Sequence, residues 1–250
     1  MNSGIKPTRT LIGFMMILLL WQLMSLLINR PIMPSPITVL PLFFSSLFGD
    51  LGWHLLASTG RVMASIVLAV IFAVPIGLGL GQTPKLNRIF DPLIAIIYPI
   101  PKIVFLPLIY LLLGITDVSK IFLITIIIFF QILVVVRDEA ANLRPELILS
   151  VRSLGAGRRA LFRFVYLPAS LPAVLTALRI SVGTAIAVLF IAEQSLTNYG
   201  LGYYIVIETY QVLRYPEMYA GIMTMSLLGL VLYLAIQQLE HRVNQHLRVG

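Results

Sequence analysis

The sequence contains no cysteine and only three histidines among its 250 residues. Without cysteine, the chain can form no disulfide, no cysteine-ligated zinc site and no thiol nucleophile. His54, His241 and His246 are not spaced as metal ligands, and we expect all three to be solvated. The chain also lacks the Gly-x-x-x-x-Gly-Lys-Ser/Thr pattern, so it cannot cradle a nucleotide through a P-loop. We therefore expect no metal site and no catalytic residue in this chain.

Charged residues are also scarce. They make up 11% of the chain, whereas soluble domains carry about 25%. Hydrophobic residues make up 59%, and the mean hydropathy is +0.96. The net charge of +8 would suggest nucleic acid in a soluble protein. Here it is better explained by lysine and arginine held on the cytoplasmic side of a membrane.

The apolar residues gather in runs long enough to cross a bilayer as helices, which takes about 20 residues. We predict an all-α fold: a polytopic membrane helix bundle that forms a single domain over residues 1–250. The six predicted spans are about 11–28, 62–81, 93–113, 121–136, 171–192 and 218–236. The first run could be a signal peptide, but Asn29-Arg30-Pro31 is not a small-residue cleavage site, so we interpret it as a retained span. Residues 37–48 are expected on the surface or against the bundle.

Two spans carry residues unusual in a helix. Gly77, Gly79 and Gly81 lie in the second span, where small residues let helix backbones approach closely. No strand precedes them, which excludes a dinucleotide-binding loop. Tyr98-Pro99-Ile-Pro101-Lys102 interrupts the third span. Irregular backbone at membrane depth survives only where protein or water satisfies its polar groups, so this break is expected to be covered.

Six spans place both termini on one side of the membrane. With that side in the cytoplasm, the inside segments carry twelve lysines and arginines, and the outside segments carry only Arg30, Lys120 and Arg214. This asymmetry predicts cytoplasmic termini and a cytoplasmic loop at residues 137–170.

The 137–170 loop, hereafter the coupling loop, contains two amphipathic pieces. Their apolar stripes comprise Leu147, Ile148, Val151 and Leu154, then Leu161, Phe162 and Val165. Pro145 suits a first helical position and Gly155 a C-terminal cap, so the pieces should meet at a glycine hinge and end at Leu167-Pro168. Arg159 and Arg163 oppose the second stripe. Periodicity alone leaves two interpretations open: docking into a socket on a partner protein, and adsorption to anionic lipid.

This loop resembles the cytoplasmic signature of ABC-importer permeases, and within them the nitrate, sulfonate and taurine group. The signature reads Glu-Ala-Ala, three residues, Gly, nine residues, and Ile-x-Leu-Pro. Placing its glycine on Gly155 puts Val165 at the isoleucine position and Leu167-Pro168 at the closing pair. Its Glu-Ala-Ala then falls on Leu149-Ser150-Val151, where this sequence has diverged. Glu139-Ala140-Ala141 lies too far upstream to be the motif.

Further fragments extend the resemblance over about residues 33–240. They are Met33-Pro34-Ser35-Pro36, Ser58-x-x-Arg61-Val62, Pro99-x-Pro101, Leu106-Pro107-Leu, Gly114-Ile, Ala192-Glu193 and Gly200-Leu-Gly202. Each fragment is weak alone, and their order and spacing together are specific.

The resemblance implies a multi-pass permease subunit of the bacterial inner membrane. Two copies would form the path for a small solute, such as nitrate, a sulfonate or taurine. Cytoplasmic ATPases would supply the energy and an external binding protein the solute. This chain would bind no cofactor, with ATP and Mg on the partner ATPase, and no nucleic acid. The implied ATPase-docking residues are Leu149, Ser150, Val151, Ser153, Leu154, Gly155, Ala156, Gly157 and Arg158, supported by Arg159, Arg163, Leu167 and Pro168.

Three ionisable residues lie in or beside predicted spans. Intramembrane charges usually face a bundle interior or an aqueous path. Lys102 and Arg179 could help an anion to cross, or could snorkel or bond backbone carbonyls near the broken segments. Glu193 could brace an outer gate through the Gly200-Leu-Gly202 loop. An autonomous carrier or channel is the rival hypothesis, favoured by the broken third span and these charges but not by the basic coupling loop. An intramembrane enzyme is excluded because no span carries paired catalytic groups.

Overall fold

The computed structural model describes residues 7–194 and 196–248, with side chains for 12–194 and 196–243. Within these ranges every regular element is a helix, which confirms the all-α prediction. The elements in chain order are α1 (Pro7–Ile28), α2 (Pro36–Leu47), α3 (Asp50–Gln82), α4 (Pro84–Ile97), η1 (Lys102–Phe105), α5 (Leu106–Leu113), α6 (Asp117–Ala141), α7 (Pro145–Ser153), α8 (Arg158–Leu161), η2 (Phe162–Tyr166), α9 (Leu167–Glu193), α10 (Leu201–Tyr203), η3 (Tyr204–Tyr210) and α11 (Tyr215–Arg248). Here η1 is a 3₁₀ turn, and η2 and η3 are π-helical.

Four helices of the described part are long and apolar enough to cross a membrane: Asp50–Gln82, Asp117–Ala141, Arg158–Glu193 and Tyr215–Val243. The pair Pro84–Ile97 and Lys102–Leu113, bent by 76°, would form a fifth span. The predicted first span falls in α1, whose described apolar part, Ile12–Ile28, is shorter. The helices also extend past the predicted spans, since α3 begins at Asp50 and α11 runs through the polar tail to Arg248.

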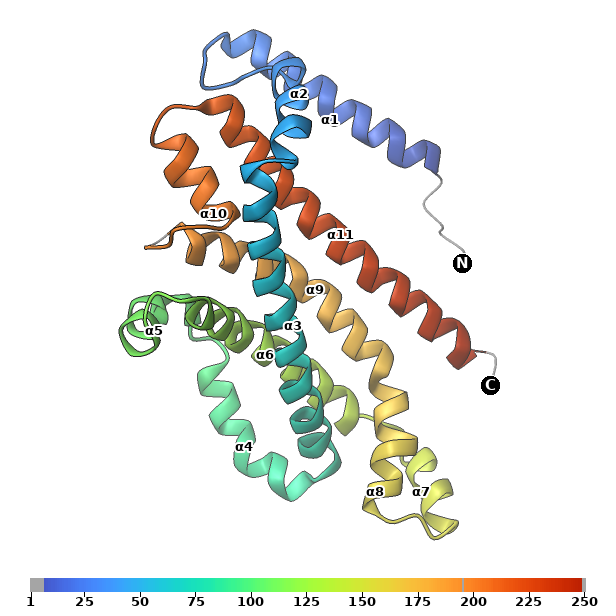
Figure 1. Ribbon diagram of the computed structural model, residues 1–250. Helices are drawn as coiled ribbons and strands as arrows, with labels where there is room; N and C mark the ends of the chain where they lie inside the picture. The colour runs from blue at the N-terminus through green and yellow to red at the C-terminus, as the bar shows by residue number, and fades with distance from the viewer. Residues whose placement is uncertain (1–6, 195, 249–250) are drawn as a thin grey trace.

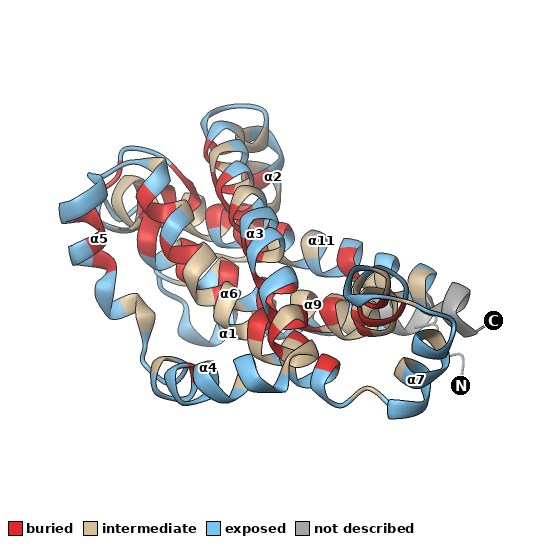
Figure 2. Ribbon diagram, turned by 90° about the horizontal axis from the view of Figure 1, so that it is seen from below, coloured by how far each residue is buried: buried red, intermediate tan, exposed pale blue. Residues whose placement is uncertain are grey.

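The centre of the bundle is formed by α3, α6 and α9 (Figure 1). Seen from below, the buried residues concentrate on these three helices (Figure 2). Gly77 and Gly81 make the contact between α3 and α6 close. A Cβ added at Gly81 would lie 2.5 Å from the Cβ of Ala140, and one at Gly77 3.0 Å from the Cβ of Val136. Gly79 has no atom within 4 Å of such a Cβ, so only two of the three glycines pack as expected.

The break between α4 and α5 is covered by one side chain. Pro99 and Pro101 end α4, which leaves carbonyl groups without helical partners. The ammonium of Lys102 donates to the carbonyls of Ile97 and Tyr98 at 3.0 Å, and of Ile100 at 3.2 Å. The expectation that protein groups satisfy this irregular backbone is therefore met.

The coupling loop lies at the end of the molecule opposite α1 and α2 (Figure 1). Helix α7 ends at Ser153, and Gly155 has a φ of +83°, a left-handed conformation that glycine adopts without strain. Contrary to prediction, Leu167-Pro168 does not end the second piece, because helix continues from Arg158 to Glu193. Phe162–Tyr166 is π-helical and leads directly into α9, which contains Pro168 at its start.

Candidate functional site: a buried clamp and an exposed coupling loop

A polar stripe runs along one buried face of α3. His54, Ser58 and Arg61 follow one another at intervals of four and three residues, which places them on the same side of a helix. All three are buried, in a helix whose other buried residues are mostly apolar. Buried polar groups need partners, so this stripe must face other polar groups.

The stripe faces the loop that follows α9 and leads into α10, where three consecutive backbone amides bond two of its side chains and Glu193. The amide of Gly200 donates to Nδ1 of His54 at 3.0 Å, and the amide of Leu201 donates to Oγ of Ser58 at 2.8 Å. The amide of Gly202 donates to Oε2 of Glu193, also at 3.0 Å. The loop therefore keeps its backbone satisfied beside the membrane spans through side chains of α3 and α9. We call these residues, together with Arg61 and Asp117, the loop clamp.

Arg61 connects the clamp to a third helix. Its Nη1 donates to Oε1 of Glu193 at 2.5 Å and to the carbonyl of Tyr199 at 3.0 Å. On the other side of the guanidinium, Nη2 and Nε donate to Oδ1 of Asp117 at 2.6 and 2.9 Å. One arginine thus holds α3, α6, α9 and the loop together.

Glu193 is fully enclosed, with 0% of its surface exposed. Besides the hydrogen bonds from Arg61 and Gly202, its carboxylate accepts one from the hydroxyl of Ser58, whose oxygen lies 2.8 Å from both carboxylate oxygens. A carboxylate that accepts several donors and faces a guanidinium can remain charged without water. Its helix, α9, is also fastened by the hydroxyl of Tyr110, which donates to the carbonyl of Ala192 at 2.6 Å.

The clamp leaves no room for side chains on the loop. A Cβ at Gly200 would lie 2.5 Å from Cδ of Glu193, and the φ of Gly200 is +127°. A Cβ at Gly202 would lie 2.7 Å from the carbonyl oxygen of Phe190. The Gly200-Leu-Gly202 pattern is therefore required by close approach of the loop to Glu193 and Arg61.

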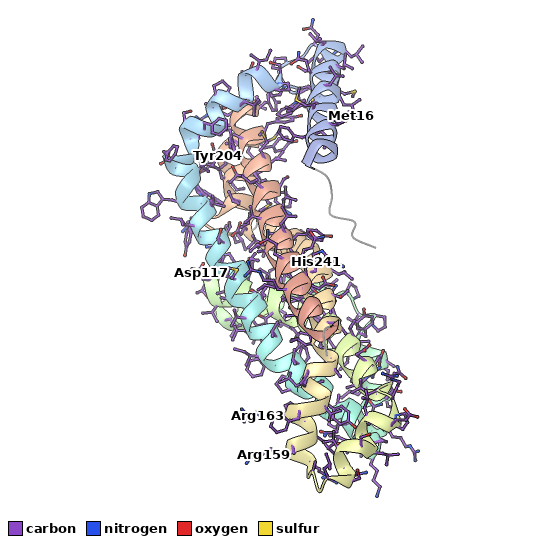
Figure 3. All side chains as sticks on the ribbon, turned by 90° about the vertical axis from the view of Figure 1, so that its right-hand side faces the viewer. Met16, Asp117, Arg159, Arg163, Tyr204 and His241 are labelled. Carbon is purple, nitrogen blue, oxygen red and sulfur yellow. The ribbon has the colours of Figure 1, made fainter. Side chains whose placement is uncertain are left out.

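Tyr199 closes the exposed side of the clamp. Its ring lies 4.4 Å from the Arg61 guanidinium carbon, and its hydroxyl donates to Oδ2 of Asp117 at 2.7 Å. That hydrogen bond, together with burial, raises the pKa of Tyr199. Asp117 is 45% exposed and is the clamp's contact with solvent. In Figure 3 it lies between Tyr204 and two labelled arginines of the coupling loop, Arg159 and Arg163.

Chemically, the clamp is a set of paired charges that fixes backbone. It presents no nucleophile beside a free base, because His54 accepts from the loop through Nδ1 and faces Glu208 through Nε2 at 3.2 Å. What the arrangement can do is hold the loop after α9 in one position, or release it when the charge pairs separate.

The structure places the three predicted path residues apart. Glu193 is in the clamp and contacts the Gly200-Leu-Gly202 loop, as its predicted bracing role requires. Lys102 is bonded to carbonyls at the α4–α5 break. Arg179 faces Glu240 of α11, with Nε 3.4 Å from Oε2. The bonds of Lys102 are those of the structural alternative, whereas the pairing of Arg179 with a carboxylate was described by neither alternative.

The residues predicted for ATPase docking form one projection at the lower end of the bundle. Leu149, Ser150 and Ser153 are exposed, and Leu154 is 85% exposed. Only Ile148 and Val151 of the first predicted stripe pack partly against the core, so the stripe is divided between two faces. In the second stripe Leu161 and Val165 are buried, while Arg158, Arg159 and Arg163 are exposed and Leu167 and Pro168 half-buried (Figure 3).

The contacts of the clamp were mostly not predicted. Ser58 and Arg61 appeared only within a fragment of the family resemblance, and His54 was expected to be solvated but is buried. His241, by contrast, is exposed, and the side chain of His246 lies outside the described residues. The available signal was the spacing of His54, Ser58 and Arg61 in an otherwise apolar helix. Asp117 carries no comparable signal, since it looks like an ordinary acidic residue in a first helical turn.

Comparisons with known proteins agree on one class. The family described as binding-protein-dependent transport system inner membrane component matches residues 65–245. The chain is 34% identical over 190 residues to the taurine transport system permease protein of Escherichia coli K12, which covers 76% of this chain and 69% of that protein. It is 28% identical over 250 residues to the formylaminopyrimidine transport permease protein of Halalkalibacterium halodurans, with 96% and 94% covered. An inward-facing structure of the MetNI methionine ABC transporter matches with a TM-score of 0.64 at 20% identity, over 78% of this chain and 96% of that chain, which shows the fold alone.

Proposed function

This chain belongs to the family of binding-protein-dependent transport system inner membrane components, and from this premise we propose how it is coupled, oriented and supplied with solute. It is an inner-membrane permease of an ABC importer, and its relatives are transport permeases rather than enzymes. We propose that ATP and Mg bind to a separate cytoplasmic subunit, that an external binding protein delivers the solute, and that two copies of the chain enclose the path.

The observation that carries this proposal is the exposed coupling loop. At the end of α7, Leu154 is 85% exposed and lies beside basic residues in the sequence. Its apolar surface has no partner within the described chain. Leu149 and Leu154 supply the apolar contact, and Arg158 supplies charge. We propose that this surface, rather than lying on lipid, fits a groove of the ATPase.

Gly155 is the residue on which this docking depends most. No atom of the described chain lies within 4 Å of a Cβ built there, so packing inside the permease does not demand glycine. The φ of +83° does favour glycine at this position. A partner surface that approaches the backbone closely would also leave no room for a side chain. Gly157 is the matched control, because its φ of −77° suits any residue and its surroundings are equally open.

Copurification tests the docking. We expect the wild-type chain and Gly157→Ala to retain the cognate ATPase through size-exclusion chromatography. Gly155→Asp should reach the membrane in equal amount but lose the ATPase, because it adds both backbone strain and a charge at the contact. Gly155→Asn, which has nearly the same shape as aspartate but no charge, should bind in between. Undiminished ATPase retention by Gly155→Asp would remove the docking site from this segment.

For the solute, we propose a small organosulfonate such as taurine. The support is the 34% identity to the taurine permease and similar matches to permeases described for aliphatic sulfonates. Specificity is expected to be set largely by the binding protein. Uptake of labelled taurine in competition with methanesulfonate, nitrate and formylaminopyrimidine would rank the candidates, and preference for formylaminopyrimidine would overturn the sulfonate assignment.

We propose that the coupling loop and both termini face the cytoplasm, which places the loop clamp toward the outer side. The clamp then braces the outer gate, and Glu193 is its central member. Single cysteines introduced at Ser153 and Asn198 test this orientation in intact spheroplasts, because the chain has no cysteine of its own. A membrane-impermeant maleimide should label Asn198→Cys from outside and leave Ser153→Cys unlabelled. The reverse pattern would overturn the orientation.

A further inference from the structure

Lys120 is a buried cation with most of its hydrogen-bonding capacity unused. It lies in the first turn of α6 and is 2% exposed. Its ammonium donates one long hydrogen bond, to the carbonyl of Thr116 at 3.4 Å. An ammonium has three protons to donate, and within the described part of the chain two of them have no acceptor. Lys102, which is half-buried, has by contrast a carbonyl acceptor for each of its three protons.

The nearest carboxylates are already engaged. Asp117 accepts from Arg61 through Oδ1 and from Tyr199 through Oδ2. Glu193 is bound by Arg61, Ser58 and Gly202. In the part of the chain with described side chains, no carboxylate oxygen lies within 4.0 Å of the Lys120 ammonium. A buried charge in this condition is costly unless something else pairs with it.

Lys120 lines a cavity of about 260 Å³. The other lining residues are Ile115, Thr116, Asp117, Leu196, Thr197, Asn198 and Tyr199. Threonine, asparagine and tyrosine side chains supply neutral hydrogen-bonding groups around the ammonium. The cavity is smaller than the roughly 300–1,000 Å³ that drug-sized ligands fill, so it suits a small headgroup. Figure 3 locates it through Asp117, one of its lining residues.

The position of the cavity at the start of α6 also favours an anion. The first turn of a helix carries partial positive charge, and α6 is 25 residues long. Asp117 opposes an incoming anion, while its bonds to Arg61 and Tyr199 offset part of that repulsion. The site should therefore hold an anion weakly, as a transport path requires if the solute is to leave again.

We propose that this cavity is an anion-binding subsite that takes the sulfonate, or a similar small oxyanion, of the transported solute, with Lys120 as its charged ligand. The proposal rests on the proposed function, because it places the subsite on the outer side of the permease. The shared chemistry is an oxyanion. A free solute and the phosphate of a lipid headgroup could both supply it, and we assign the solute.

Binding to the purified full-length chain tests the assignment. The probe is sodium methanesulfonate, added to lipid-free detergent micelles at constant ionic strength against sodium chloride, with thermal unfolding and titration calorimetry as readouts. We expect saturable binding and a raised unfolding temperature. In Lys120→Met, which keeps the apolar stem and removes the charge, the Kd should rise about tenfold or more, because charge-assisted hydrogen bonds are lost. Lys102→Met is the matched control, and its Kd should match that of the wild type.

Asn198→Ala keeps the test decisive if Lys120→Met does not fold, and should raise the Kd by about threefold to tenfold through loss of a neutral hydrogen bond. Unchanged binding in both variants would overturn the site. So would a response to anionic phosphatidylglycerol vesicles with none to methanesulfonate, which would assign the cavity to lipid. ATP-dependent uptake is measured separately. A chain that binds methanesulfonate through Lys120 but supports no such uptake would contradict the proposed function and leave the site standing.

Discussion

Removing the charge of Glu193 should destabilise the permease more than any single change at its surface. In Glu193→Gln the Arg61 guanidinium stays 2% exposed and keeps only the carboxylate of Asp117, which is 45% exposed. Breaking a buried ion pair from one side costs about 3–5 kcal/mol, because the remaining charge is left without compensation. We therefore expect the free energy of unfolding to fall by about 3–5 kcal/mol.

A double variant distinguishes the energy of the Arg61–Glu193 ion pair from that of its other hydrogen bonds. Arg61→Met with Glu193→Leu removes both charges, so neither is left buried alone. It still strands the amide of Gly202 and the hydroxyl of Ser58, at about 1–3 kcal/mol each. The double variant should lose less stability than the two single variants added together, by about 2 kcal/mol or more. Asp117→Asn should cost only about 1 kcal/mol, since its carboxylate is partly solvated.

Equilibrium unfolding in mixed micelles, titrated with dodecyl sulfate and followed by tryptophan fluorescence, gives these differences. Arg214→Gln is the control, because Arg214 is 60% exposed in its pair with Glu217 at 3.0 Å, and its loss should change the stability by less than about 0.5 kcal/mol. The reasoning is refuted if Glu193→Gln lies within 1 kcal/mol of the wild type, or if the single-variant losses simply add.

Two further predictions concern the packing of the spans. Gly81→Ala should lower the free energy of unfolding by about 1–3 kcal/mol, because its Cβ would meet Ala140 at 2.5 Å, whereas Gly79→Ala should be neutral or slightly stabilising. The same unfolding titration checks both, and equal effects would contradict the close contact of α3 with α6. Lys102→Met should expose the α4–α5 break, and hydrogen exchange at residues 97–104 should accelerate at least tenfold while α3 is unaffected. Unchanged protection there would show that the lysine does not hold the bend.

Composition and periodicity were enough to predict the helical bundle. The scarcity of charged residues indicated that most of the chain lies in lipid. The long apolar runs then gave the positions of α3, α6, α9 and α11. Pro99 and Pro101 marked the break before α5 correctly, since proline acts locally. Helix ends were predicted less well, because amphipathic extensions such as residues 50–61 of α3 have no long apolar run to reveal them.

The clamp could not be predicted in the same way, because it is assembled from residues far apart in the chain. Arg61 contacts Asp117 and Glu193, which lie 56 and 132 positions away. Lys102 and Arg179 were left with two possible roles, because a charge inside a span does not reveal its partner. The structure supplies the partners, which are backbone carbonyls for Lys102 and Glu240 for Arg179. Periodicity offered both apolar stripes of the coupling loop to a partner or to lipid. Leu154 is 85% exposed and available for such a contact, whereas Leu161 and Val165 are buried within this chain.

The most direct test of the central claim is taurine uptake into vesicles that contain this chain with its cognate ATPase and binding protein. We expect accumulation that requires all three components and ATP hydrolysis, persists in Gly157→Ala and is abolished in Gly155→Asp. Uptake by the purified chain alone, without ATPase or ATP, would contradict the account and identify an autonomous carrier.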